Sequence, residues 1–91
     1  GARRESTYVE LPSDHRVAAV RVPPALVGRS LAAARFRETF GATVLMVARS
    51  DATGKETRFI PEGGTTFAAG DRLIVFGAQD KLEALERGSA S

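Results

Sequence analysis

Few side chains in this sequence are of the types that perform acid–base or nucleophilic chemistry. The 91 residues include one histidine, one tyrosine, no cysteine and no tryptophan. His15 lacks the further ligands that a metal site requires, so we interpret it as a linker residue. Asp71 belongs to a Gly-Asp turn and is more typical of a turn-capping carboxylate than of a general base. Because no nucleophile and base occur in a recognisable set, the sequence indicates a protein that is not an enzyme and has no metal and no resident cofactor.

Arginine is the residue type best suited to bind a ligand here. Arg37 falls near the end of an expected helix. A guanidinium can form bidentate hydrogen bonds to a phosphate and can stack on nucleotide bases. The alternative is that Arg37 is a solvated cation that complements the helix dipole. Arg21 and Arg49 lie on expected strands, where they either reach an anionic ligand or protect a strand edge from aggregation.

The composition is that of an ordinary soluble domain. Hydrophobic residues make up 43% and charged residues 26% of the chain, and the net charge is +2. This charge is too small to indicate nucleic-acid binding, and basic and aromatic residues do not interleave. No apolar run approaches the roughly 20 residues of a membrane-spanning helix, so we expect a cytoplasmic location. The acidic residues around the expected hairpin do not match a calcium-loop spacing; they are Asp51, Glu56 and Glu62.

The elements that must position these residues are organised around the stretch from Gly70 to Gly77. Its apolar run from Leu73 to Phe76 predicts the central strand of a sheet, buried on both faces. The alternation of residues 17–22 predicts a second strand, ended by Pro23 and Pro24. A third strand is expected over residues 43–49, with a turn at 50–55 and a returning hairpin arm at 57–60. A short edge strand is expected at 7–11.

Two helices are expected to cover this sheet. Ser30 is a good N-cap for a helix over residues 31–39, and Gly41 follows where a helix-ending glycine belongs. Ala33, Phe36 and Phe40 fall on one stripe of that helix. The spacing of Asp80 and Glu83 predicts a capping box for a last helix, whose apolar face includes Leu82 and Leu85 and which ends at Gly88.

The order strand, helix, three strands, helix predicts an α+β domain with a small mixed, mainly antiparallel sheet and two helices. We expect residues 1–15 to form a linker or lead-in strand, residues 16–88 to form the domain, and residues 89–91 to be a disordered tail.

The order of these motifs resembles the TrkA-C domain, the C-terminal subdomain of the RCK regulators of potassium conductance. The resemblance covers about residues 16–86. It rests on Gly28-Arg29-Ser30-Leu31, Arg37, Phe40-Gly41, the strand to Ala48-Arg49, Pro61 and the stretch Gly70 to Gly77. The Gly-x-Gly-x-x-Gly of the companion dinucleotide-binding subdomain is not found after a strand. We therefore expect an excised piece, or a domain attached directly to a membrane protein by the linker.

The resemblance implies a cytoplasmic regulatory domain of a potassium or cation channel, transporter or antiporter. Such domains form homodimers, and some bind a ligand such as cyclic di-AMP at the dimer interface. It implies ligand contacts from Arg37, Thr43, Val44 and Pro61. Thr43 departs from the asparagine that is frequent in ligand-binding members, because it keeps a hydroxyl and loses the amide. The departure favours an alternative, a ligand-free structural dimerisation module of a membrane transporter.

Overall fold

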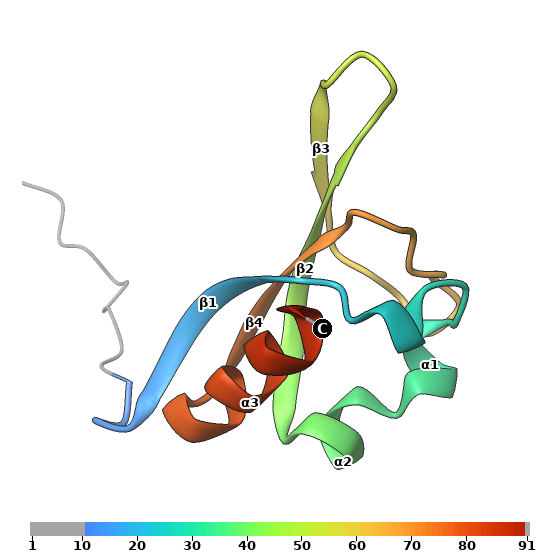
Figure 1. Cartoon of the computed structure of the whole chain (residues 1–91). Coiled ribbons are helices and arrows are strands. Elements are labelled where there is room, and N and C mark those ends of the chain that lie inside the picture. Colours follow the sequence, from blue (N-terminus) through green and yellow to red (C-terminus); the bar gives the residue numbers. More distant parts are fainter. Residues whose placement is uncertain (1–10, 91) are drawn as a thin grey trace, which may run out of the picture.

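A computed structural model describes residues 11–90 of the chain (Figure 1). The predicted edge strand at 7–11 therefore lies almost wholly outside the described residues. The elements, in chain order, are β1 (His15–Arg21), the short 3-10 helix η1 (Pro24–Leu26), α1 (Leu31–Ala34), α2 (Phe36–Phe40), β2 (Ala42–Ser50), β3 (Glu56–Phe59), β4 (Arg72–Ala78) and α3 (Gln79–Ala90).

The strands form one sheet of order β1-β4-β2-β3, so β4 is flanked by strands on both sides as predicted. All three strand pairs are antiparallel. The α+β class is thus confirmed, and the sheet is purely antiparallel because no parallel crossover occurs among the described strands. β2 and β3 continue beyond the other strands as a hairpin that projects from the body of the molecule (Figure 1). The positive φ of 86° at Gly54 permits its tight turn.

The two faces of the sheet differ in burial. Leu73 and Val75 of β4 are 0% exposed and face the helices, whereas the alternate residues Ile74 and Phe76 are only half-buried. The prediction that this strand is buried on both faces is therefore wrong. A continuous apolar run does not reveal that helices cover one face only. We call the face of Leu73 and Val75 the inner face and the opposite one the outer face.

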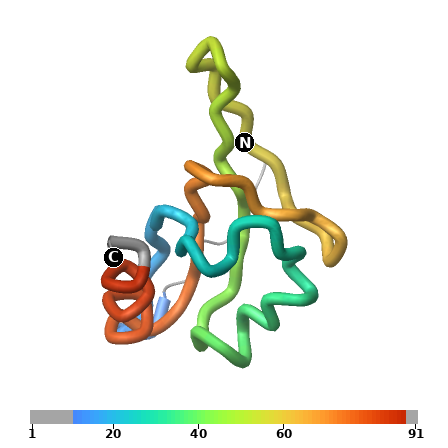
Figure 2. The backbone as a smooth tube through the Cα atoms, turned by 45° about the vertical axis from the view of Figure 1, so that its right-hand side comes forward, coloured from blue at the N-terminus to red at the C-terminus, as the bar shows by residue number. Residues whose placement is uncertain are grey.

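A single core lies between the inner face and the helices. α3 runs in front of β1 and β4, α2 lies beside β2, and α1 packs against α2 (Figures 1 and 2). Leu82 and Leu85 of α3 are buried, as the predicted apolar stripe requires. The other core residues are Val20, Val22, Leu26, Ala34, Phe36, Ala42, Val47, Phe67, Leu73 and Val75.

The predicted helix over residues 31–39 is interrupted at Arg35, where φ is 46° and ψ is 54°. The left-handed residue turns the chain between α1 and α2. Because of this break, Ala34 is buried in place of Ala33, while Phe36 and Phe40 remain neighbours with ring centroids 4.7 Å apart. The expected single stripe is thus replaced by two short helices that each place one side in the core.

The last helix also differs from its prediction at both ends. α3 begins at Gln79, so Asp80 lies in its first turn and no capping box forms with Glu83. The Gln79 N–H instead donates to the carbonyl of Asp14, 2.7 Å away, because β4 runs directly into the helix. The helix continues through Gly88 to Ala90, so Gly88 does not end it. None of the described helices has the length and apolarity needed to cross a bilayer.

Candidate ligand pocket beside Arg37

A surface pocket of about 430 Å³ lies where α1 and α2 meet the beginning of β2. This volume falls in the range of small-molecule sites. Nine residues line it: Leu31, Ala32, Arg35, Phe36, Arg37, Glu38, Ala42, Thr43 and Val44. Two arginines and one glutamate lie beside an apolar wall, an arrangement suited to a ligand that is anionic and partly aromatic.

The first wall of the pocket includes Leu31 and Ala32 of α1. It is held in place by the connection between β3 and β4. The Ser30 hydroxyl accepts a hydrogen bond from the Ala33 N–H at 3.1 Å, which caps α1 as predicted. The N–H groups of Leu31 and Ala32 donate to the carbonyls of Thr65 and Gly63 at 2.9 and 3.0 Å. The first turn of α1 is therefore occupied by protein carbonyls and has no free amides to offer an anion.

The turn at Arg35 sets the direction of the second wall. Arg35 is the one residue other than glycine with positive φ in the described chain, a conformation that costs of order 1 kcal/mol or more for an L-residue. The Thr39 hydroxyl donates to the Ala34 carbonyl at 3.1 Å across this turn. The break therefore presents Arg35 and Arg37, which flank the buried Phe36, to the same pocket.

The third wall is the open edge of β2. β3 pairs only with Val47–Ser50, so the first half of β2 has a strand partner on the β4 side alone within the described residues. Gly41, with φ of 67°, ends α2 and turns the chain into this strand. The pocket thus lies beside an unpaired strand edge, where a second molecule has access.

Three of the predicted ligand residues meet in this pocket. Arg37, Thr43 and Val44 all line it. Pro61 does not line it, although the connection that includes Pro61 bonds to Leu31 and Ala32, which do. Arg35 also lines the pocket but was not predicted from the sequence. Its left-handed backbone could not be predicted, because the surrounding residues favour one continuous helix.

Neither pocket arginine is held by the described part of the protein. Arg35 and Arg37 are exposed and make no side-chain hydrogen bond or ion pair with the described part of the chain. A cation without an internal partner can bind an anion without first breaking an existing pair.

Arg49 is held in the opposite manner, by a buried carboxylate. Its Nε and Nη2 donate to Oδ1 and Oδ2 of Asp71 at 2.9 and 2.8 Å, and Nη2 also donates to the Thr66 carbonyl at 2.9 Å. The guanidinium lies over the ring of Phe59, 5.1 Å from its centroid. Arg49 therefore holds the loop before β4 in place, and neither of its predicted roles, ligand binding or edge protection, describes it.

Asp71 is 1% exposed and its Oδ2 also accepts from the Ala68 N–H, so it caps a turn as predicted and forms the ion pair as well. Burial by itself raises the pKa of Asp71. The hydrogen bond from Arg49, that from Ala68 and the Arg49 charge outweigh this effect and lower the pKa below its ordinary value. The same pair raises the pKa of Arg49.

The remaining candidates do not form a site. His15 is the first residue of β1 rather than a linker residue; it stacks near Phe76 at 5.4 Å and its Nδ1 lies 2.8 Å from Asp14 Oδ1. No group of three or more histidine, cysteine or acidic residues is placed to hold a metal within the described residues. Asp51 closes the hairpin turn by accepting from the Thr53 hydroxyl and from the N–H groups of Thr53 and Lys55.

Comparison with known proteins identifies the family. The sequence matches the TrkA-C domain over residues 17–87. The chain belongs to the TrkA-C domain family. A search of curated proteins finds no match.

Solved structures agree with this assignment. The crystal structure of the GsuK RCK domain aligns with a TM-score of 0.67 and 23% identity, which covers 86% of this chain and 17% of that one. The GsuK channel bound to NAD aligns with a TM-score of 0.67 and 26% identity, which covers 85% of this chain and 14% of that one. The GsuK channel aligns with a TM-score of 0.64 and 27% identity, which covers 81% of this chain and 13% of that one. This chain therefore spans less than a fifth of the length of these proteins and has the fold of one part of them.

Proposed function

We propose that this TrkA-C domain is a cytoplasmic regulatory domain of a potassium or cation channel, transporter or antiporter, and that it dimerises and binds a nucleotide in the pocket beside Arg37. The observation that carries the proposal is the pocket itself, in which two arginines without an acceptor in the described residues lie against an apolar wall. A purine fits the apolar side and phosphates fit the guanidinium groups. Cyclic di-AMP is the first ligand to test.

The open edge of β2 supports the dimer. The pocket is bounded by α1, α2 and β2 and is open on the side where β3 does not extend. A second copy placed there completes the enclosure of a ligand. A ligand that prefers one arrangement of the two copies shifts the equilibrium between arrangements by its difference in affinity, and this shift is passed to the membrane part.

The second candidate is a structural dimerisation module that binds no ligand. It is favoured by Thr43, whose hydroxyl offers less hydrogen bonding than an amide at the pocket wall. In the ligand-binding candidate, the dimer interface at Arg37 encloses a polar ligand site. In the structural module, the interface at Arg37 is apolar and excludes water.

A thermal-unfolding titration with cyclic di-AMP tests the proposal, with cyclic di-GMP, ATP and NAD as comparison ligands. NAD is included because it is bound in the GsuK channel structure. At 100 times the dissociation constant a ligand adds about 2.7 kcal/mol to the free energy of unfolding. We expect a selective increase in melting temperature that Arg37→Ala abolishes.

The matched control is Arg29→Ala, because Arg29 is also exposed but does not line the pocket. Sedimentation of the same samples reports the dimer. A dimer without any ligand-induced shift supports the structural module, and a chain that stays monomeric at high concentration rejects both candidates.

A further inference from the structure

The outer face of the sheet bears an apolar patch that spans three neighbouring strands. In the register of the sheet, Ala19 is opposite Ile74, which in turn is opposite Met46, and Val17 is opposite Phe76. Val17 is 50% exposed, whereas Val75 on the inner face is 0% exposed. We call these residues the outer patch: Val17, Ala19, Met46, Ile74 and Phe76.

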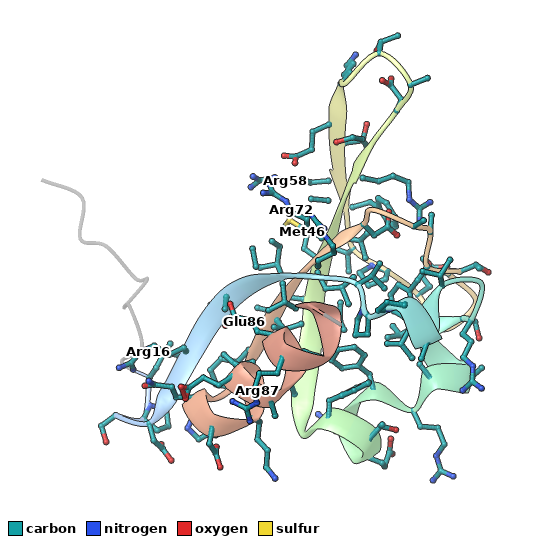
Figure 3. The ribbon with its side chains drawn as sticks, viewed as in Figure 1. Arg16, Met46, Arg58, Arg72, Glu86 and Arg87 are labelled. Carbon is teal, nitrogen blue, oxygen red and sulfur yellow. The ribbon has the colours of Figure 1, made fainter. Side chains whose placement is uncertain are left out.

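One end of the outer patch is bordered by arginines. Arg21 is opposite Arg72, Arg72 is opposite Ala48, and Ala48 is opposite Arg58, so one row crosses all four strands. Figure 3 shows Arg58 and Arg72 close to Met46 on the same side of the sheet. Because Arg58 and Arg72 carry two positive charges against the single carboxylate of Glu56, this end of the patch favours an acidic neighbour.

A glutamate holds two members of this row in position. Glu56 accepts from Arg58 through Oε2 at 3.2 Å and from Arg72 through Oε1 at 3.1 Å. All three side chains are at least a third exposed, so these surface pairs contribute little to stability. Their geometry shows instead that the guanidinium groups of Arg58 and Arg72 can bind one carboxylate between them.

The inner face of the same strands shows which kind of element packs on this sheet. There the amphipathic helix α3 packs Leu82 and Leu85 against β1 and β4, and α2 packs against β2. The outer patch lies on the same two strands and on β2, and the described helices leave it uncovered. A second helix on this face completes a helix–sheet–helix arrangement.

The size of the patch also fits one helix. Three strands span roughly 10 Å between the outer strand axes, and the seven residues of β1 extend roughly 23 Å. This width matches the diameter of one helix, about 10 to 12 Å.

We propose that the outer patch and its arginine row form a docking site for an acidic amphipathic helix of a partner protein. The apolar stripe of the helix packs on the outer patch, and glutamates or aspartates at one end pair with Arg58 and Arg72. None of the patch residues lines the nucleotide pocket, although Phe76 of the patch is opposite Thr43, which does.

A fluorescent synthetic helix tests the proposal by fluorescence anisotropy with the full chain. The probe has about five turns, leucines at i, i+3, i+4 and i+7 spacing, and glutamates in its last two turns. The control peptide has lysines in place of the glutamates. We expect the acidic peptide to bind at least about tenfold more tightly, with an affinity that falls as salt is added.

Variants of the chain locate the binding. Arg58→Glu combined with Arg72→Glu is expected to abolish the preference for the acidic peptide. Glu56→Gln is expected to strengthen binding of the acidic peptide, because it removes the carboxylate that already occupies two guanidinium groups. Val17→Asn is expected to weaken binding, and its matched control Val27→Asn, at a position 41% exposed outside the patch, is expected to leave it unchanged.

Equal binding of the two peptides, or binding that none of these variants alters, overturns the proposal. Two further outcomes also overturn it. Tighter binding to vesicles that contain phosphatidylserine than to the acidic peptide assigns the site to a lipid surface. Self-association that is lost in Val17→Asn, measured by sedimentation, assigns the patch to a second copy of this chain.

Discussion

The two ends of β2 use arginine in opposite ways. At its C-terminal end, Arg49 donates through two nitrogens to a carboxylate that is 1% exposed. At its N-terminal end, Arg35 and Arg37 line a pocket and have no acceptor within the described chain. The difference separates an arginine that belongs to the fold from arginines that are available to a ligand. Each of the following changes tests this distinction.

Arg49→Ala is expected to have the largest effect on stability. It leaves Asp71 buried without its cation, and because Arg49 itself is 37% exposed, the loss should lie below the about 3 to 5 kcal/mol of a fully buried pair. Asp71→Asn is expected to cost less, because Arg49 is 37% exposed and water replaces part of the lost interaction. Chemical denaturation of both variants checks these expectations. A loss below about 1 kcal/mol in Arg49→Ala would show that this pair is no more structural than an ordinary surface pair.

Gly77→Ala tests the packing under the pocket. A Cβ at Gly77 would lie 3.1 Å from the Cβ of Ala42 and 3.3 Å from the Gly41 carbonyl oxygen, at the start of β2. We expect a loss of about 1 to 3 kcal/mol and partial recovery when Ala42→Gly is added. Gly64→Ala is the control, because a Cβ at Gly64 would have no neighbouring atom within 4 Å. Equal melting temperatures for the two single variants would contradict the close approach.

The Asp71 pair also predicts a dependence on acid. The pKa of Asp71 is lowered in the folded chain, so the folded state binds this proton less readily than the unfolded state. The stabilisation that the Asp71 carboxylate contributes is complete above its unfolded pKa of about 3.9. It is lost as pH falls through the lower pKa of Asp71 in the folded chain. Its slope does not exceed about 1.4 kcal/mol per pH unit. Denaturation measured from roughly pH 5 down to roughly pH 2 should show a shallower slope in Asp71→Asn.

Arg37→Ala is expected to have the smallest effect on stability, within about 0.5 kcal/mol of the unchanged chain, as for surface positions in general. The same variant is expected to lose the ligand-induced shift in melting temperature. Unfolding measured with and without cyclic di-AMP separates the two effects. A large loss of stability without ligand would make Arg37 a structural residue like Arg49.

Local patterns in the sequence were sufficient to predict most of the strands. The alternation of Ala18, Val20 and Val22, the glycine turn at Gly54 and the N-cap at Ser30 each depend on neighbouring residues, and each is present in the structure. The pocket residues Arg37, Thr43 and Val44 were found through the family resemblance. They meet because α2 turns directly into β2 at Gly41.

The features that were missed depend on interactions across the fold. Arg49 and Asp71 are 22 residues apart, and only the register of β2 with β4 brings them together. The left-handed turn at Arg35 is maintained by tertiary packing against a helical preference of the surrounding alanines. The half-exposed outer face was missed because the run Leu73 to Phe76 is apolar on both sides.

The contacts of Thr66 link the hairpin to the pocket. Its carbonyl accepts from Arg49 at the base of the hairpin, and Thr66 forms a strand-like bridge with Ser30, the residue that caps α1. Three segments distant in sequence are thus tied together by hydrogen bonds. We expect these segments to open as one cooperative unit in hydrogen exchange, so that the amides of Leu31, Ala32 and Phe67 become accessible together. We therefore expect a displacement of the projecting hairpin to reach the pocket wall through the contacts of Arg49 with Thr66 and of Thr66 with Ser30.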